Sequence, residues 1–230
     1  MLPSTIRIAF YNSTLAILFL FWAQIASFWC FARNVFGEEC QPHAHLLRLL
    51  RTKISRKAKV HGETKVLLFN HVSWADFIID NHITDCKSTS ISRMILILAI
   101  PFSSLLGWFS QTIYFINRTK RLNIEHVLDE INNKYGRYVL LYPEGTRNRT
   151  GAILPLKRGF LSTIYKRNLQ TQIVFVSNKE KVLDEKSLRI GFDVECKVVE
   201  SAPIVPSSFA TFDNFYQHVS SEWLLFSGGN

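Results

Sequence analysis

An uncharged, apolar stretch over residues 8–32 is the longest hydrophobic run in the chain. A helix of about 25 residues is about 37 Å long, enough to cross a hydrocarbon core of about 30 Å. The run is too long for a cleaved secretory signal, and Arg7 is the only basic residue before it. We therefore predict a membrane anchor over residues 1–33, either a spanning helix or a hairpin in one leaflet that breaks near Asn12 or Gln24. A buried helix of a soluble domain is the alternative.

From Val60 onward, short apolar runs alternate with amphipathic stretches, which is typical of an α/β domain. The pattern predicts strands over residues 66–69, 112–116, 138–142 and 173–176, and one or two more within 189–205. Apolar residues at helical spacing predict a helix over 124–135, which Gly136 ends as a C-cap. We expect a single domain over residues 60–230, with a mixed central sheet flanked by helices.

A second apolar stretch covers residues 94–109 and is interrupted by Pro101 and Gly107. The proline predicts a kink or a break in any helix formed there. A stretch of about 16 residues is too short for a full membrane crossing. It predicts either a kinked core helix or a second, interfacial membrane contact.

Charge adds a preference for anionic partners, because 27 Lys and Arg residues outnumber 18 Asp and Glu residues and give a net charge of +9. Six of the basic residues fall within residues 48–59, which contain no acid. A basic run beside a membrane segment marks its cytoplasmic flank and attracts anionic lipid. We therefore expect residues 34–59 to be a basic juxtamembrane linker, with solvated His43 and His45, and the domain to face the cytoplasm.

Other readings of the composition are excluded or disfavoured. An apolar fraction of 47% with 13% aromatic residues excludes a disordered chain. No zinc finger, RNP signature or basic leucine zipper accompanies the basic run, so we expect no nucleic-acid partner. Cys30, Cys40, Cys86 and Cys196 are scattered without a C-x-x-C pair, which predicts four reduced thiols and no zinc site.

The first candidate for chemistry follows the predicted strand 66–69. Ser73 and Asp76 have capping-box spacing, which predicts a helix that starts at Ser73 and leaves His71 in the preceding turn. The bend lets His71 and Asp76 converge, and an imidazole held by a carboxylate is a general base for an alcohol. Taken alone, this spacing is more often structural. A serine hydrolase that uses Ser73 is disfavoured, because no G-x-S-x-G elbow surrounds it.

The second candidate is the polar loop over residues 143–151. Gly145 allows a close approach of the backbone to a ligand, and Arg147 and Arg149 are suited to phosphate oxygens. Thr146 can donate a hydrogen bond, and Glu144 can accept one from a hydroxyl. Lys157 lies near the start of the next predicted helix, where anions are favoured.

Together these elements resemble the glycerolipid acyltransferase family, which includes the 1-acylglycerol-3-phosphate acyltransferases. The resemblance covers residues 59–160 closely and rests on four ordered motifs. They are Asn70, His71, Ser73 and Asp76; Phe115, Ile116, Asn117 and Arg118; Pro143, Glu144, Gly145, Thr146 and Arg147; and Lys157 with Gly159. The chain departs from the family in residues 173–177, where a frequent Val-Pro pair is absent.

The resemblance implies a membrane-bound acyltransferase domain over residues 60–230. His71 would be the general base, oriented by Asp76, and the acceptor alkoxide would attack the thioester of acyl-CoA. Arg118, Arg147 and Lys157 would hold the acceptor's phosphate, and Glu144 its glycerol oxygens. The expected partners are the lipid bilayer, acyl-CoA and a lysophospholipid, with no metal and no other cofactor.

The implied reaction converts lysophosphatidic acid into phosphatidic acid. Another lysophospholipid or glycerol-3-phosphate remains open as the acceptor, as does the identity of the acyl carrier. The expected location is the endoplasmic reticulum in a eukaryote and the inner membrane in a bacterium. A non-catalytic module that binds anionic lipid is the alternative from a different class.

Overall fold

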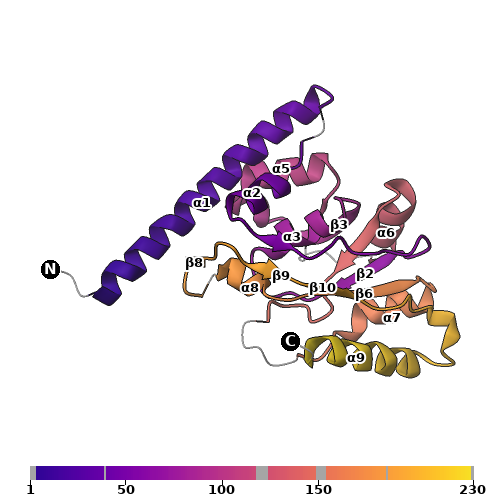
Figure 1. The fold of residues 1–230 in the computed structure, drawn as a ribbon. Coiled ribbons are helices and arrows are strands. Elements are labelled where there is room, and N and C mark those ends of the chain that lie inside the picture. Colours follow the sequence, from indigo (N-terminus) through magenta and orange to yellow (C-terminus); the bar gives the residue numbers. More distant parts are fainter. Residues whose placement is uncertain (1–3, 39, 118–123, 149–153, 185, 229–230) are drawn as a thin grey trace.

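The computed structural model describes residues 4–38, 40–117, 124–148, 154–184 and 186–228. Its first element, α1 (Ser4–Val35), is one continuous helix whose N-terminal part extends beyond the rest of the molecule (Figure 1). The hairpin alternative is therefore wrong. By length and composition alone Asn12–Val35 qualifies as a membrane span, and 28% of that window is buried. A mostly exposed apolar helix does not fit the core helix of a soluble domain.

The domain is built on a six-stranded sheet in the order β10-β6-β2-β5-β3-β4. The strands are β2 (Val66–Phe69), β3 (Ser88–Arg93), β4 (Ile113–Ile116), β5 (Tyr138–Leu141), β6 (Thr171–Val176) and β10 (Val198–Glu200). All neighbours pair in parallel except β10, which is antiparallel to β6. The predicted mixed α/β sheet is confirmed.

Helices cover both faces of this sheet, so its central strand is buried on both sides. Leu67 and Phe69 share a core with α2 (Pro42–Leu49) and α3 (Asp76–Ile83). Val66 and Leu68 face the opposite core, formed with α6 (Ile124–Asp129), α7 (Arg158–Lys166) and α9 (Phe212–Gly228). Figure 1 shows α2 and α3 on one side of the sheet and α7 and α9 on the other. This double burial explains why β2 reads as an unbroken apolar run.

The four strands predicted individually are confirmed, and residues 189–200 contain three strands where one or two were expected. In the main sheet, β3 is the strand that the hydrophobic pattern missed. Its sequence, Ser-Thr-Ser-Ile-Ser-Arg, lacks an apolar run, yet Ser88 and Thr89 are fully buried. The hydroxyl of Thr89 donates to the Gln111 carbonyl at 2.6 Å, and that of Ser88 lies 2.8 Å from the Thr84 hydroxyl. Because hydroxyl groups satisfied in this way can be buried at little cost, the strand needs no apolar side chains there.

The helix predicted over 124–135 forms as α6 and continues into one π-helical turn, η1 (Glu130–Lys134). Val127, Leu128 and Ile131 are buried on one face, as their spacing predicts. Gly136 follows with φ +63°, so the predicted glycine C-cap is confirmed.

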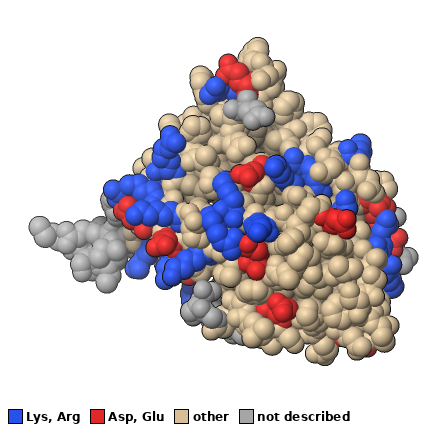
Figure 2. Space-filling view, turned by 45° about the vertical axis from the view of Figure 1, so that its right-hand side comes forward, with Lys and Arg blue, Asp and Glu red and all other residues tan. Residues whose placement is uncertain are grey.

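The segment expected to be a linker contains two elements that pack against the domain. Leu46 and Leu47 of α2 are buried in the core, and β1 (Lys53–Ile54) pairs in parallel with β9 (Glu195–Cys196). The remaining small elements are α8 (Lys179–Val182), β7 (Leu183–Asp184), β8 (Arg189–Ile190) and η2 (Pro206–Ser208). On the face shown in Figure 2, Lys and Arg side chains gather on part of the surface with Asp and Glu between them.

His43 is buried in α2, at 6% exposure, so the expectation of a solvated side chain is wrong. Its ring packs edge-on against Phe77, and its Nδ1 lies 3.5 Å from the Cys86 sulfur. Burial, with smaller contributions from His82 and Lys57, lowers the pKa of His43 to about 4. Folding therefore keeps this imidazole neutral at a pH where the unfolded chain protonates it.

We expect acid to destabilise the protein through His43. The folded pKa lies below the unfolded value of 6.5, so stability is lost as the pH falls from 6.5 toward 4. The difference corresponds to about 3 kcal/mol of unfolding free energy. Urea unfolding of the detergent-solubilised protein at a series of pH values measures it. The variant His43→Phe should show a flatter pH dependence over this range, and an equal slope in both proteins would contradict the assignment.

Two of the four cysteines form a disulfide, so the expectation of four reduced thiols is wrong for Cys30 and Cys40. The side-chain amide of Asn34 donates to the carbonyls of both residues, at 2.9 and 3.1 Å, and holds the segment after α1 against its last turns. The two Cα atoms are 4.9 Å apart, within the range that a disulfide can bridge. Cys86 and Cys196 are free. Burial raises their pKa values to about 11 and about 12, so both remain thiols at neutral pH.

The apolar stretch over residues 94–109 forms two short helices, α4 (Leu96–Ala99) and α5 (Pro101–Phe109), separated at the predicted proline. It is not a core helix, because Leu98 is 80% exposed and Trp108 64%. Gln24 of α1 fixes the start of α5, since its Oε1 accepts from the backbone of Phe102 and its Nε2 donates to the Ser103 hydroxyl. The polar residue that could have broken α1 instead joins it to α5.

Candidate active site

The first predicted motif lies at the carboxyl edge of the sheet, where β2 ends at Phe69 and the chain turns into α3. The helix begins at Asp76, three residues later than the predicted start at Ser73. The intervening residues form a turn that is closed by the Asp76 carboxylate, which accepts hydrogen bonds from the backbone of Val72 and Ser73. In open parallel sheets, ligands bind at this edge.

His71 and Asp76 converge as the bend predicts. His71 Nδ1 lies 2.6 Å from Asp76 Oδ2. The Asp76 side chain is 2% exposed, whereas 25% of the His71 side chain remains accessible. Within the described ranges His71 Nε2 has no hydrogen-bond partner. A carboxylate on one imidazole nitrogen and an open second nitrogen is the arrangement of a general base.

Two neighbours fix the imidazole and its strand. The ring of Tyr142, at the end of β5, stacks on His71 with centroids 4.1 Å apart and planes 17° apart. Asn70 joins β2 to β6, because its amide donates to the Val176 carbonyl at 2.9 Å and its carbonyl oxygen accepts from the Val176 amide at 3.0 Å. Asn70 therefore holds the two strand ends together beside His71.

The hydroxyl of Ser73 is engaged in structural hydrogen bonds. It accepts from the Ala75 backbone at 2.8 Å and donates to the Lys179 carbonyl at 3.2 Å, and the residue is 2% exposed. A nucleophilic serine needs a hydroxyl that is accessible and bonded to its base. This geometry favours the structural role of Ser73 over the hydrolase reading.

We expect Ser73→Ala to retain most of the acyl transfer that the motifs imply, while lowering the unfolding free energy. Losing a buried hydroxyl that bonds two backbone groups, and leaving those groups unsatisfied, costs about 1–3 kcal/mol. Thermal unfolding in detergent and steady-state rates measure the two effects separately. A folded Ser73→Ala protein without any activity would restore the nucleophile reading.

The predicted Pro-Glu-Gly-Thr-Arg loop begins directly after β5. Gly145 has φ +71°, and a Cβ there would lie 3.0 Å from the Lys157 side chain, so both conformation and space favour glycine. The Lys157 backbone donates to the Pro143 carbonyl at 2.7 Å. The structure thus brings Lys157 onto the loop, although residues 149–153 between them lie outside the described part.

The same loop is tied to the first motif. The Asn148 backbone donates to the His71 carbonyl at 2.6 Å, and the Arg147 guanidinium lies over the Trp74 ring at 5.8 Å. Thr146, Lys157 and Gly159 are exposed. Gly159 meets no atom that would exclude a side chain. Arg118 and Arg149 lie outside the described residues.

Glu144 points inward. It is 4% exposed. Burial raises the pKa of its carboxyl, although a hydrogen bond with Asn148 lowers it in part. Its Oε2 has no hydrogen-bond partner among the residues that the structure describes. Its predicted contact with acceptor glycerol oxygens stays a prediction.

The sequence analysis did not predict two buried charged residues, Lys179 and Asp80, which lie beneath the His71–Asp76 pair. Lys179, the first residue of α8, is 0% exposed, and its ammonium lies 3.1 Å from both Asp80 oxygens and 3.3 Å from Asp76 Oδ1. Tyr142 donates to Asp80 at 3.0 Å. The four-residue spacing of Asp76 and Asp80 could have suggested a shared helix face, but nothing in the sequence assigns Lys179 to it.

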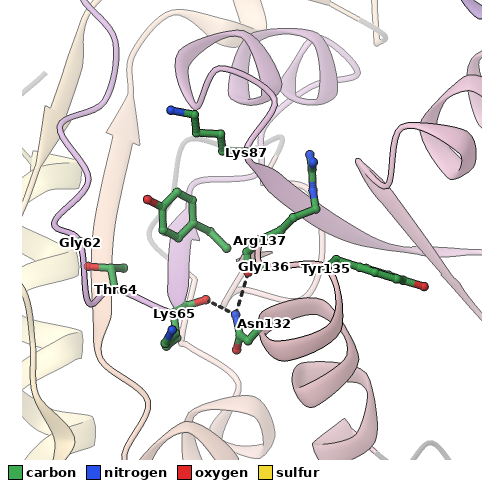
Figure 3. A pocket seen from close by; sticks show the side chains of 9 residues that line it. Gly62, Thr64, Lys65, Lys87, Asn132, Tyr135, Gly136 and Arg137 are labelled. Carbon is green, nitrogen blue, oxygen red and sulfur yellow. Dashed lines mark hydrogen bonds between the residues drawn. The ribbon is translucent and has the colours of Figure 1, made fainter. Parts of the chain in front are cut away.

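A cavity of about 290 Å³ lies at the opposite edge of the sheet, at the amino ends of β2, β3 and β5 (Figure 3). None of the predicted site residues lines it. Asn132 closes one side of this corner, because its amide donates to the carbonyls of Lys65 and Arg137 at 3.0 and 2.9 Å. These contacts join η1 to β2 and β5.

Three comparisons bear on the identity of the fold and site. The 1-acyl-sn-glycerophosphate (LPA) acyltransferase PlsC from Thermotoga maritima matches with a TM-score of 0.71 over 96% of this chain and 95% of that one. At 15% sequence identity, this likeness concerns the fold.

Two curated relatives match part of the sequence. A 1-acyl-sn-glycerol-3-phosphate acyltransferase of Haemophilus influenzae is 31% identical over 96 residues, which are 41% of this chain and 40% of the relative. A lyso-ornithine lipid O-acyltransferase of Rhizobium meliloti is 26% identical over 120 residues, 49% of this chain and 40% of the relative. The matched part thus spans about 40% of the length of these relatives.

A model of the Acyltransferase family matches residues 51–197, well over half of the chain. The match includes the His71–Asp76 pair, the Pro-Glu-Gly-Thr-Arg loop and five of the six strands of the main sheet. The chain therefore belongs to the glycerolipid acyltransferase family that its ordered motifs resemble.

Proposed function

We propose that this protein transfers a fatty acyl group from acyl-CoA to the free hydroxyl of lysophosphatidic acid, giving phosphatidic acid. The observation that carries the proposal is the contact of His71 Nδ1 with Asp76 Oδ2 at 2.6 Å, on an imidazole that remains 25% accessible. A pure lipid-binding module has no need of such a pair. The relatives named as acyltransferases support the reaction class.

The reaction proceeds in one displacement through a tetrahedral intermediate. His71 Nε2 takes the proton of the acceptor hydroxyl as its oxygen attacks the thioester carbonyl carbon. Asp76 stabilises the imidazolium that forms and keeps the proton of Nδ1 in place. The carbon–sulfur bond then breaks, and the imidazolium returns its proton to the sulfur of the leaving thiol. No acyl-enzyme is formed, in keeping with the structural role of the Ser73 hydroxyl.

Arg147 and Lys157 bind the acceptor's phosphate in this proposal, together with Arg118. The loop that carries Arg147 is joined to His71 through the bond from the Asn148 amide, so an anion held there lies beside the base. The aliphatic part of the exposed Lys157 side chain lies against Gly145 of the same loop. Orientation of two substrates in this way lowers the barrier by several kcal/mol.

The membrane holds both lipid substrates, and we propose that α1 and the α4–α5 pair enter it together. Phe21, Trp22 and Trp29 of α1 and Leu98, Phe102 and Trp108 of α4–α5 are exposed apolar side chains. Phe28 and Phe102 contact each other edge-on between the two helices, with centroids 5.2 Å apart. A joined apolar surface of this kind is typical of a membrane contact.

We propose that the domain faces the cytoplasm, because a basic run beside a membrane segment favours its cytoplasmic flank. The disulfide between Cys30 and Cys40 favours the opposite orientation, because disulfides persist mainly in oxidising compartments outside the cytoplasm. Protease treatment of sealed microsomes that carry a C-terminally tagged chain tests the orientation. Digestion of the tag supports a cytoplasmic domain, whereas a protected tag together with an intact disulfide would overturn it.

A panel of acceptors tests the reaction itself. The protein is extracted from membranes, purified and incubated with labelled acyl-CoA and one acceptor at a time. The acceptors are lysophosphatidic acid, glycerol-3-phosphate, lysophosphatidylcholine and a lyso-ornithine lipid. We expect labelled phosphatidic acid as the main product. Preference for the lyso-ornithine lipid would follow the Rhizobium relative instead. Binding of anionic vesicles without any transfer would support the non-catalytic module.

A further inference from the structure

A buried lysine lies directly beneath the proposed catalytic pair. Lys179 is 0% exposed, and its ammonium contacts the Asn70 carbonyl at 2.6 Å, Asp80 at 3.1 Å and Asp76 Oδ1 at 3.3 Å. Taking an ammonium group out of water is costly unless anions and acceptors replace the lost solvent. The fold therefore retains Lys179 here only because the surrounding groups pair with its charge.

The two oxygens of Asp76 have different partners, apart from the Ser73 backbone amide, which lies within 3.3 Å of both. Oδ2 faces His71 Nδ1 at 2.6 Å and accepts from the Val72 backbone at 2.8 Å. Oδ1 faces Lys179 and accepts from the Ser73 backbone at 3.2 Å. Rotation of the carboxylate would break contacts on both sides at once.

We infer that Lys179 is a positioning residue for the transfer reaction, which orients Asp76 so that Oδ2 stays on His71. The inference rests on the proposed roles of His71 and Asp76. Lys179 touches neither the imidazole nor, in this proposal, a substrate. Lys179 belongs to α8 and acts on the reaction through its contact with Asp76.

The same network also supports the face of the imidazole. Tyr142 donates its hydroxyl hydrogen to Asp80 Oδ2 at 3.0 Å while its ring stacks on His71. The ammonium of Lys179 lies 5.9 Å from the centre of that ring. Asp76 therefore contacts the edge of the imidazole, and Tyr142 contacts its face. Lys179 lies beside both of these residues.

Several ionisable groups surround this position, and their charges set the expected pH effects. Asp76 and Asp80 come from α3, Tyr142 and Glu144 from the end of β5, and Cys196 from β9. Burial raises the pKa of Asp80 to about 7, although Lys179 opposes this. Burial also opposes the charge on Lys179, but Asp76 and Asp80 outweigh it and raise the lysine pKa. Lys179 therefore remains a cation at neutral pH.

The Lys179 ammonium contacts Asp76, the partner of His71. Removing the cation should raise the pH at which His71 gains its inactivating proton, so the acid limb of kcat/KM moves upward. Removing an anion such as Asp80 should move it downward or leave it in place. The two substitutions thus have opposite signs, which a general loss of folded protein cannot produce.

The test compares Lys179→Met, Asp80→Asn and the double variant Lys179→Met/Asp80→Asn in the full chain. Lys179→Met alone leaves two buried carboxylates without their cation and is expected to fold poorly. The double variant removes one charge of each sign and so preserves the buried charge balance. Each folded protein is assayed with lysophosphatidic acid and acyl-CoA from pH 5 to pH 9, with His71→Ala as the inactive reference.

We expect the double variant to fold and to lose at least about tenfold in kcat/KM at pH 7. Its acid limb should move upward by less than that of a folded Lys179→Met protein, because the loss of Asp80 offsets part of the loss of the cation. Asp80→Asn should keep the wild-type limb or move it to lower pH. A double variant with wild-type rate and profile would reduce Lys179 to a structural charge partner and overturn the inference. An upward shift in Asp80→Asn would overturn it as well, even if neither lysine variant folds. An active His71→Ala protein would instead refute the proposed function.

Discussion

Replacing His71 by Ala is expected to reduce acyl transfer by about 10²- to 10⁴-fold, the usual contribution of a positioned general base. The imidazole is partly exposed and its hydrogen bond is to Asp76, so its removal should leave the core intact and the protein should still fold and bind the membrane. Rates with lysophosphatidic acid and acyl-CoA measure the loss. His45→Ala, an exposed histidine on α2, is the matched control and should retain the wild-type rate.

Asp76→Asn should cause a smaller loss than His71→Ala, because the base remains present but its orientation is lost. The carboxylate accepts from His71 and from the backbone of Val72 and Ser73, and an amide cannot replace all of these acceptors. A folded His71→Ala protein that turns over at the wild-type rate would refute the mechanism.

Arg147→Ala is expected to raise KM for a phosphorylated acceptor far more than KM for acyl-CoA. Loss of a charge-assisted contact at a partly buried site costs about 2 kcal/mol, the lower end of the measured range, which is roughly 30-fold in KM. Steady-state kinetics with each substrate varied in turn measure the two constants. Arg147→Lys should recover part of the loss, because the charge returns without the planar fork.

Arg158 provides the matched control for Arg147. It pairs with Asp213, and its guanidinium stacks on the rings of Phe212 and Tyr216 at 4.8 and 4.7 Å. Because the Arg158 side chain is already paired with residues of α9, Arg158→Ala should leave the acceptor KM close to the wild-type value. Equal increases of both KM values in Arg147→Ala would place Arg147 at the CoA phosphates or in a structural contact.

Local sequence patterns predicted the elements that present chemistry. The apolar run 66–69 became β2 with the same bounds, and the polar residues after it became the turn that holds His71 and Asp76. The helix start at Ser73 was wrong by three residues, because Asp76 closes the turn over its own preceding backbone before the helix begins. The polar strand β3 was missed because its burial depends on hydroxyl partners elsewhere in the chain.

Local patterns along the chain were enough to predict the α/β class, the apolar N-terminal helix and the order of the motifs, because each of these depends on residues close together in the sequence. Which charges meet depends on the three-dimensional packing of distant segments. Lys179 reaches Asp76 and Asp80 across about 100 residues of sequence, since β6 lies beside β2 in the sheet and α8 starts at their shared edge. The same is true of Gln24, whose contact with α5 depends on two apolar helices packing side by side. Parallel strand pairing and helix packing are long-range, and local periodicity carries no information about which strands or helices become neighbours.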